Sequence, residues 1–328
     1  MQLVVVDPVT PDRSAIARAA ELLRAGRLVA FPTETVYGLG ANALDAAAVE
    51  RIYRAKGRPN YNPLIVHVLD EAGVLTVARE WPDTAAALAR AFWPGPLTVV
   101  VRKLPIVPDG VTAGLDTVAV RVPAHPVARA LLAAARIPVA APSANRSMLL
   151  SPTTAQHVFK SLGESADMIL DAGPSAVGIE STVIDLTRAR PTLLRPGMIS
   201  IPQLESVIGP IERAGTVEGE AARSSPGMMD RHYSPRAPLV VVDAAELPMI
   251  AERERAAGRI VGALTLSAAT DAARTIRMPA DAAGYASRLF ASLHELDEVA
   301  CDVIIVERVP DSPEWLGVQD RLMRAARG

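Results

Sequence analysis

Short runs of β-branched residues alternate with alanine-rich stretches along most of this 328-residue chain. The runs predict buried strands and the stretches predict helices, since the two structures have different apolar periods. Several predicted strands follow one another without a helix between them, so strict strand–helix–strand repetition does not hold. The pattern therefore predicts an α/β fold built on a twisted open sheet of mixed strand direction.

The first two thirds of the chain supply most of these elements. Asp45 is expected to cap a helix that Gly57 ends, and Ser151 with Pro152 to open a later helix as N-cap and first-turn proline. The predicted strands are 28–31, 65–69, 97–101, 117–122, 139–141, 168–170, 181–186 and 192–194. The predicted helices are 45–56, 84–93, 127–135 and 151–162.

The composition changes near residue 210. Residues 210–236 are rich in glycine and proline, with scattered charges and little periodicity, which predicts a linker between domains 1–209 and 237–328. The second domain is expected to be small and Rossmann-like, although it contains no G-x-G-x-x-G and dinucleotide binding is unsupported. Its predicted strands are 239–242, 260–264 and 303–306, and its predicted helices are 246–257, 281–299 and 313–326.

The charge balance and the cysteine count exclude several classes of protein. Lys and Arg total 34 against 36 Asp and Glu, which argues against nucleic-acid binding through overall charge but not against a local basic patch. The single Cys301 excludes a disulfide framework and fits a reducing, cytoplasmic compartment. No apolar run approaches about 18 residues, and the first residues do not resemble a signal peptide, so no membrane span is expected.

Five segments of the first domain combine polar side chains with strand ends or tight turns. Each also has an ordinary interpretation as a turn, a helix end or an exposed strand face. Lys56 and Arg58, however, precede an extended loop that leads to His67, and two fixed cations near amides suit a polyphosphate. The segments are Phe31–Gly40, Lys56–Leu64, Thr117–Pro123, Ala141–Asn145, and Gly178–Asp185 together with Leu194–Gly197.

Several familiar chemistries lack their sequence signals. The chain has no G-x-x-x-x-G-K-[ST] loop, no G-x-S-x-G and no H-E-x-x-H, and its five histidines do not have metal-ligand spacing. No protein-bound metal is predicted. What remains is a site of Lys, Arg, Ser, Thr and Asn without an evident nucleophile, which is typical of phosphoryl and nucleotidyl transfer.

Taken in order, these segments resemble the YrdC-like family, and in particular its long form, the threonylcarbamoyl-AMP synthases. The resemblance implies a YrdC-like sheet folded around a concave, electropositive cavity. It implies L-threonine, bicarbonate and ATP with Mg²⁺ as reactants, and threonylcarbamoyl-AMP and pyrophosphate as products. The motifs are FPTETVYGLG, KGRP, NPLIVHV, WPGPLT, TVAVRVPAHP, APSAN, SPT, GIESTVIDL, LRPG and, in the linker, SPGMMDRHYSPRAPL.

The resemblance also implies roles for individual residues. Lys56 and Arg58 would be catalytic and, with Arg195, would neutralise the triphosphate. Tyr233 and its neighbours would close over the cavity, so the linker is expected to act as an active-site lid. Threonine would contact Thr35, His67, Arg121 and Ser181. The ATP site would be completed by Asn62, Thr117, Ala141, Ser143, Asn145 and Ser151.

Two segments depart from the family pattern. Met148–Leu150 replace a segment with a glycine and a basic residue, and Met229 and Asp230 replace Lys and Tyr.

The resemblance further implies a downstream tRNA threonylcarbamoyltransferase and contact with tRNA or double-stranded RNA. Three alternatives stay open: a non-catalytic RNA-binding module, a carbamoyl-transfer domain of the hydrogenase-maturation kind, and a protein whose polar turns only cap strands.

Overall fold

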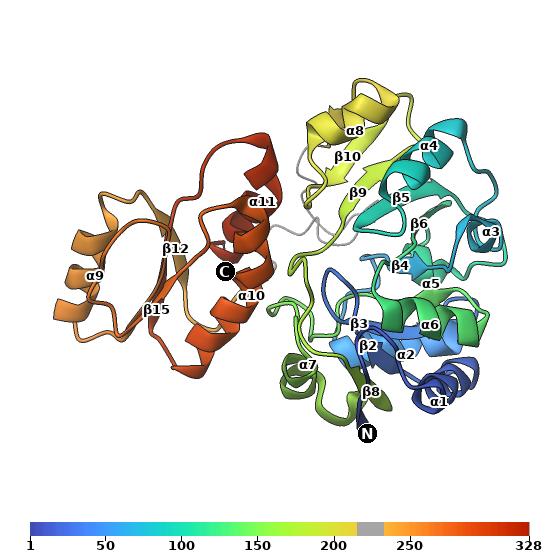
Figure 1. Ribbon diagram of the computed structural model, residues 1–328, viewed down its shortest axis with the longest axis horizontal. Coiled ribbons are helices and arrows are strands. Elements are labelled where there is room, and N and C mark those ends of the chain that lie inside the picture. Colours follow the sequence, from blue (N-terminus) through green and yellow to red (C-terminus); the bar gives the residue numbers. More distant parts are fainter. Residues whose placement is uncertain (215–232, 328) are drawn as a thin grey trace.

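The computed structural model describes residues 1–214 and 233–327. Within these residues the chain forms one sheet of 11 strands and a second sheet of four strands. Figure 1 shows the two sheets side by side, with the helices α10 (Ala282–Glu298) and α11 (Leu316–Ala325) between them. The predicted α/β class, with one large twisted sheet and a smaller second domain, is confirmed.

The large sheet and its helices occupy residues 1–214. Its strands are β1 (Gln2–Val5), β2 (Val29–Phe31), β3 (Gly38–Asn42), β4 (Ile65–His67), β5 (Leu97–Arg102), β6 (Thr117–Arg121), β7 (Val139–Ala140), β8 (Met168–Asp171), β9 (Thr182–Asp185), β10 (Thr192–Arg195) and β11 (Glu212–Arg213). The helices are α1 (Arg13–Arg24), α2 (Ala46–Lys56), α3 (Glu71–Val74), α4 (Asp83–Phe92), α5 (Asp109–Thr112), α6 (Pro126–Ala135), α7 (Ala155–Leu162) and α8 (Ile201–Ile208).

The strand order of the large sheet is β1-β8-β2-β3-β7-β4-β6-β5-β9-β10-β11. Strands β4 and β6 are parallel, whereas β5 and β6 are antiparallel, which confirms the predicted mixed direction. Successive residues of a strand face opposite sides. Val29 and Phe31 accordingly pack under α1 and α6, while Ala30 packs on the side of α2 and α4. Both faces of the sheet are therefore covered by helices.

Most predicted elements are confirmed to within a residue or two, including the caps of α2. The Asp45 carboxylate accepts from the amides of Ala47 and Ala48, and Gly57 ends the helix at φ 58°. The prediction for Ser151 and Pro152 is wrong. Helix α7 begins at Ala155, because Thr154 caps it by accepting from the amide of His157, and the Ser151 hydroxyl bonds to Glu180 instead.

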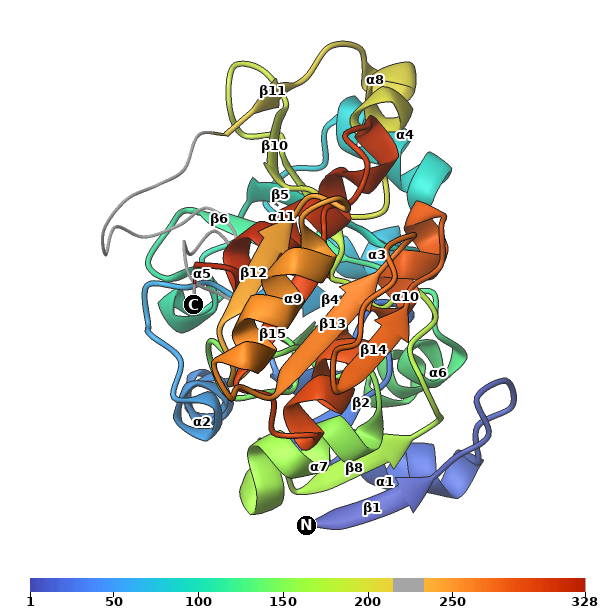
Figure 2. The ribbon, with the colours of Figure 1, turned by 90° about the vertical axis from the view of Figure 1, so that its left-hand side faces the viewer.

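The smaller sheet is entirely parallel, in the order β12 (Leu239–Val242), β15 (Val303–Glu307), β13 (Val261–Thr265), β14 (Arg274–Arg277). Viewed from the side of the smaller sheet, Figure 2 shows α9 (Leu247–Ala256) on its outer face, away from the large sheet. Strand β11 lies inside the predicted linker, where it pairs with β10. No helix among the described residues is long and apolar enough to cross a membrane.

Two stacked histidines lie in the interface between α7 and α10. The rings of His157 and His294 have centroids 3.8 Å apart, and His294 Nε2 lies 3.1 Å from the carbonyl oxygen of Ser151. Burial lowers the pKa of His157 to about 3, with a further contribution from His294, and burial lowers the pKa of His294 to about 4. The pair is therefore neutral at pH 7.

This pair predicts that acid weakens the fold. Below pH 6.5 the unfolded chain protonates both histidines, whereas the folded chain does not until about pH 4, so stability present above pH 6.5 is lost as the pH falls. The loss should reach about 1 kcal/mol per pH unit. Thermal melts of His157→Gln/His294→Gln between pH 7 and 5 should show a shallower dependence. Arg54→Gln, which removes an exposed ion pair with Glu50 on another helix, should keep the original slope. An unchanged slope in the double histidine variant contradicts the prediction.

Candidate active site

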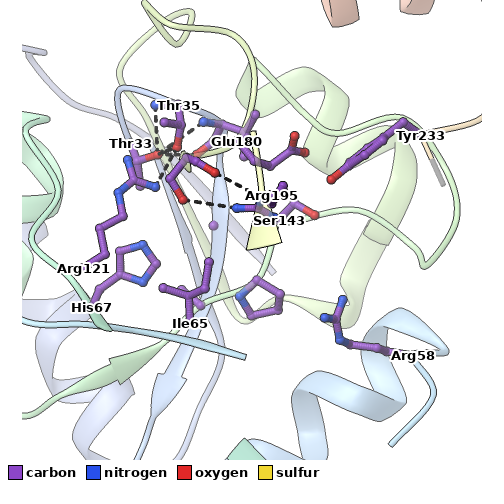
Figure 3. Close-up of a pocket in the computed structure, with 15 residues that line it drawn as sticks. Thr33, Thr35, Arg58, Ile65, His67, Arg121, Ser143, Glu180, Arg195 and Tyr233 are labelled. Carbon is purple, nitrogen blue, oxygen red and sulfur yellow. Dashed lines mark hydrogen bonds between the residues drawn. The ribbon is translucent and has the colours of Figure 1, made fainter. Parts of the chain in front are cut away.

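The ends of several strands of the large sheet surround one pocket, shown in Figure 3. Arg121 and His67 lie at one end of the view, Arg58 and Tyr233 lie at the other, and Ser143 and Arg195 lie between them. The mixed strand order brings these distant segments together. The lining residues are Thr33, Thr35, Val36, Gly38, Arg58, Ile65, His67, Arg121, Ala141, Pro142, Ser143, Glu180, Ser181, Arg195 and Tyr233.

Arg121 is held at the end of β6 by three groups. Its Nη1 donates to Thr35 Oγ1 at 2.9 Å, its Nε donates to the Gly95 carbonyl oxygen at 3.2 Å, and its Nη2 lies 2.7 Å from Glu34 Oε1. Burial raises the pKa of Glu34, but the charge of Arg121 and the hydrogen bonds to the carboxylate together outweigh burial and leave that pKa below its ordinary value. The guanidinium is thus fixed, buried and available on one side to an anionic ligand.

His67 lies beside Arg121, because the two residues pair across β4 and β6. Burial, followed by the charge of Arg121, lowers the pKa of His67 to about 3, so its ring is neutral at pH 7. Its Nδ1 is buried without a hydrogen-bond partner among the described residues. A neutral ring nitrogen facing a pocket can therefore serve a polar ligand.

Arg195 and Ser181 form one unit at the ends of β10 and β9. Arg195 Nη2 donates to Ser181 Oγ and Nε donates to the Ser181 carbonyl oxygen, both at 3.1 Å. The hydroxyl groups of Ser181 and Thr98 are 2.7 Å apart. Burial lowers the pKa of Arg195, which stays a cation at neutral pH.

Arg58 follows Gly57, where the chain leaves α2. Its Nε donates to the Asn62 carbonyl oxygen at 3.0 Å, and its Nη2 donates to the Pro63 carbonyl oxygen at 2.8 Å. Burial lowers the pKa of Arg58 to about 10, so the group remains charged at pH 7. The loop after α2 thus wraps the guanidinium and holds it at the pocket.

Lys56 does not line the pocket, although it is only two residues from Arg58. Its Nζ donates to the carbonyl oxygens of Ser143 and Asn145, and the side chain is 3% exposed. Burial, and secondarily Arg58, lowers the pKa of Lys56 well below its ordinary value. Lys56 therefore organises the loop that carries Ser143.

Four other predicted residues do not line the pocket. The Asn62 carbonyl oxygen accepts from Arg58, and the Asn145 side-chain amide donates to the Leu149 carbonyl oxygen at 2.8 Å. The Ser151 hydroxyl bonds to Glu180. Thr117 is the half-buried first residue of β6. Ala141, Ser143 and the four residues predicted to bind threonine all line the pocket.

Glu180 is a pocket residue that the sequence did not predict. Its position directly before Ser181, inside the quoted motif GIESTVIDL, was the available signal.

Met148, which replaces a glycine of the family pattern, adopts φ 74°, the left-handed conformation that glycine tolerates best. A methionine therefore occupies a backbone conformation that a glycine at this position would adopt with less strain.

The predicted lid lies mostly outside the described residues. Residues 215–232, including the departures Met229 and Asp230 and the motif residues Arg231 and His232, are not described. Tyr233, which follows them, is 1% exposed and lines the pocket, and its ring centroid is 5.5 Å from that of Phe290.

Fold and pocket define an α/β protein with a buried, arginine-lined site for an anionic ligand. The chain belongs to the Sua5/YciO/YrdC family: residues 21–197 match its family model, described as telomere recombination. Residues 199–327 match the model described as threonylcarbamoyl-AMP synthase, C-terminal domain. The resemblance stated from the motifs is confirmed.

Similar curated proteins and solved structures cover nearly the whole chain. A threonylcarbamoyl-AMP synthase of Pyrococcus abyssi is 43% identical over 94% of this chain and 93% of its own length. One of Bacillus subtilis is 43% identical over 99% of this chain and 96% of its own length. The crystal structure of P. abyssi Sua5 complexed with L-threonine has a TM-score of 0.96, with 41% identity over 100% of this chain and 98% of that one.

The position of Lys56 predicts a stability role that is separate from contact with ligand. Lys56→Met should lower the free energy of unfolding by about 2–3 kcal/mol, because two buried carbonyl oxygens lose a charged donor. Urea denaturation measures this change. Lys160→Met removes an exposed lysine with a surface ion pair and should change stability by less than about 1 kcal/mol. Equal effects of the two substitutions would show that the role assigned to Lys56 is wrong.

Proposed function

We propose that this chain is a threonylcarbamoyl-AMP synthase, a nucleotidyltransferase. It joins L-threonine, bicarbonate and ATP into threonylcarbamoyl-AMP and pyrophosphate, for the threonylcarbamoyladenosine modification of tRNA. The observation that carries the proposal is the polarity of the pocket: a fixed arginine with a neutral histidine at one end and a second arginine at the other. The names of the relatives and the threonine complex of P. abyssi Sua5 support it.

The end with Arg121 and His67 suits threonine. Arg121, already oriented by Glu34 and Gly95, pairs with the substrate carboxylate. Ser181 and Thr35 supply hydroxyl groups for the polar side chain and the amine. Because these groups are held by bonds of their own, little reorganisation accompanies binding.

The reaction then proceeds in two bond-forming steps. The threonine ammonium loses a proton to solvent, and the free amine attacks the carbon of bicarbonate or of CO₂ derived from it. The product is a carbamate, with release of water from bicarbonate or of a second proton when CO₂ reacts. A carbamate oxygen attacks the α-phosphorus of ATP, and the bond to the β-phosphate oxygen breaks to release pyrophosphate. Positioning and charge neutralisation supply most of the catalysis in such transfers.

The end with Arg58, together with the middle of the pocket at Arg195, suits the triphosphate. Arg58 and Arg195 are buried cations whose donors can meet phosphate oxygens, and Ser143 sits on the loop that Lys56 holds. Among the described residues, no group of three or more His, Cys, Asp or Glu side chains could hold a metal ion. A Mg²⁺ ion would enter with ATP, held by its phosphates and water, and would neutralise charge on them.

A long RNA cannot reach these arginines. Arg58, Arg121 and Arg195 are 7%, 3% and 3% exposed, so they suit a small anion that enters a pocket. This favours the enzyme over the RNA-binding alternative.

The product, a reactive mixed anhydride, needs protection from water, and buried Tyr233 at the pocket suits that role. A cytoplasmic tRNA-modifying transferase would be the partner that consumes it.

Pyrophosphate release tests the proposed function directly. Release should require ATP, L-threonine and bicarbonate together, since the carbamate is the nucleophile. A coupled phosphate assay with each reactant left out in turn measures the dependence. Release that continues at the full rate without threonine or without bicarbonate overturns the proposal.

The two ends of the pocket predict a reciprocal pair of variants. Arg58→Met should lower kcat/KM for ATP by about 100-fold or more while threonine binding changes little. Arg121→Met should weaken threonine binding by about 100-fold, because the carboxylate of the bound threonine loses a bidentate partner. Calorimetric titration with threonine and steady-state kinetics with ATP measure the two effects. Loss of threonine binding in both variants would contradict the assignment of separate ends.

A further inference from the structure

The second domain reaches the wall of the pocket at Glu180. This glutamate lines the pocket directly before Ser181 and is 7% exposed. From helix α11, Arg321 Nε donates to Glu180 Oε2 at 2.7 Å, and Nη2 donates to the Glu180 carbonyl oxygen at 3.2 Å. The Arg321 side chain is itself fully buried. A residue of the second domain is therefore bonded to a pocket residue through two of its nitrogens.

Arg321 also holds the neighbouring segment of the pocket. Its Nη1 donates to the Pro196 carbonyl oxygen at 2.9 Å, and Pro196 directly follows Arg195. One guanidinium thus joins the segment that carries Ser181 to the segment that carries Arg195. Because its donors have a fixed planar geometry, Arg321 sets the position of the two segments relative to each other.

The packing around Arg321 is close. Gly317, one turn earlier on α11, lies against Gly197, and a Cβ added at Gly317 would be 2.6 Å from the Gly197 carbonyl oxygen. The Tyr233 ring centroid is 5.2 Å from the Arg321 guanidinium carbon, within range of a cation–π contact. The absence of a side chain at Gly317 lets the helix approach closely enough for Arg321 to reach Glu180.

We propose that Arg321 is a positioning residue of the active site that the second domain supplies. It does not line the pocket; it acts through Glu180 and Pro196 to keep Ser181 and Arg195 in place for threonine and the triphosphate. The inference rests on the proposed function, because it takes Ser181 and Arg195 as ligand contacts. An interface ion pair alone would change melting and leave substrate affinity unchanged.

The test uses conservative variants of the full-length chain. Arg321→Lys keeps the charge but loses the planar donors, and Glu180→Gln keeps the shape but loses the carboxylate. Each should weaken threonine binding about tenfold in calorimetry and raise KM for ATP more than it lowers kcat. The double variant should lose no more than about the larger single effect, because the two residues act through the same contact.

Arg324→Lys is the matched control. Arg324 lies one turn further along α11, and its Nε donates to Asp320 Oδ1 at 3.0 Å, a carboxylate that also pairs with Arg321. The threonine affinity of the Arg324→Lys variant should stay within about twofold of that of the unmodified protein. Thermal melts of every variant report folding, so a loss of affinity is compared among folded proteins.

Several outcomes overturn the inference. Arg321→Lys that melts earlier but binds threonine normally would leave only a structural role. If Arg321→Lys does not fold, normal threonine affinity in Glu180→Gln would likewise leave Arg321 only a structural role. The proposed function is tested independently: it is wrong if the unmodified protein releases no threonine-dependent pyrophosphate. In that case, a fall in threonine affinity in Arg321→Lys would still support the role of Arg321 in positioning the pocket residues.

Discussion

The burial of cationic side chains is the constraint on which the pocket depends. A buried guanidinium is stable only when carbonyl oxygens or carboxylates replace its water. Arg121 finds Glu34 and the Gly95 carbonyl oxygen, and Arg195 finds the backbone of Ser181. Each partner lies in a segment that leads into a strand (β3, β5 or β9), so satisfying the arginines also fixes these segments. The chain therefore combines a net charge of −2 with a pocket suited to anions.

Elements with strong periodicity could be predicted from the sequence, and elements defined by packing could not. Helix α10 has a long apolar stripe, and its predicted and observed bounds differ by one residue at each end. Strand β3 was not predicted, because its sequence is typical of a glycine-rich turn. Its Gly40 is required by close packing, since an added Cβ would lie 2.8 Å from Phe31 Cε1. That neighbour comes from β2, and the sequence alone does not show the contact.

The same difference separates the predicted site residues. Motif order identified the segments that meet at the pocket, but spacing could not decide which cation faces it. Lys56 is the last residue of α2 and points to the loop of Ser143, whereas Arg58 comes after the left-handed Gly57 and reaches the pocket. The left-handed conformation of one glycine thus gives two neighbouring cations different surroundings. Sequence could not identify Glu180 either, because its partner Arg321 lies 141 residues away along the chain.

The second domain has an open parallel sheet, and one of its own carboxylates occupies backbone amides at the end of a strand. Three successive amides after β13, from Leu266 to Ala268, donate to the Glu307 carboxylate at 2.6–3.0 Å. In open parallel sheets, loops at the carboxyl ends of the strands are where anions bind. With an internal carboxylate in that position, these three amides are not available to a phosphate. What this domain offers the proposed reaction is therefore its inner face, where α11 carries Arg321 to the back of the pocket.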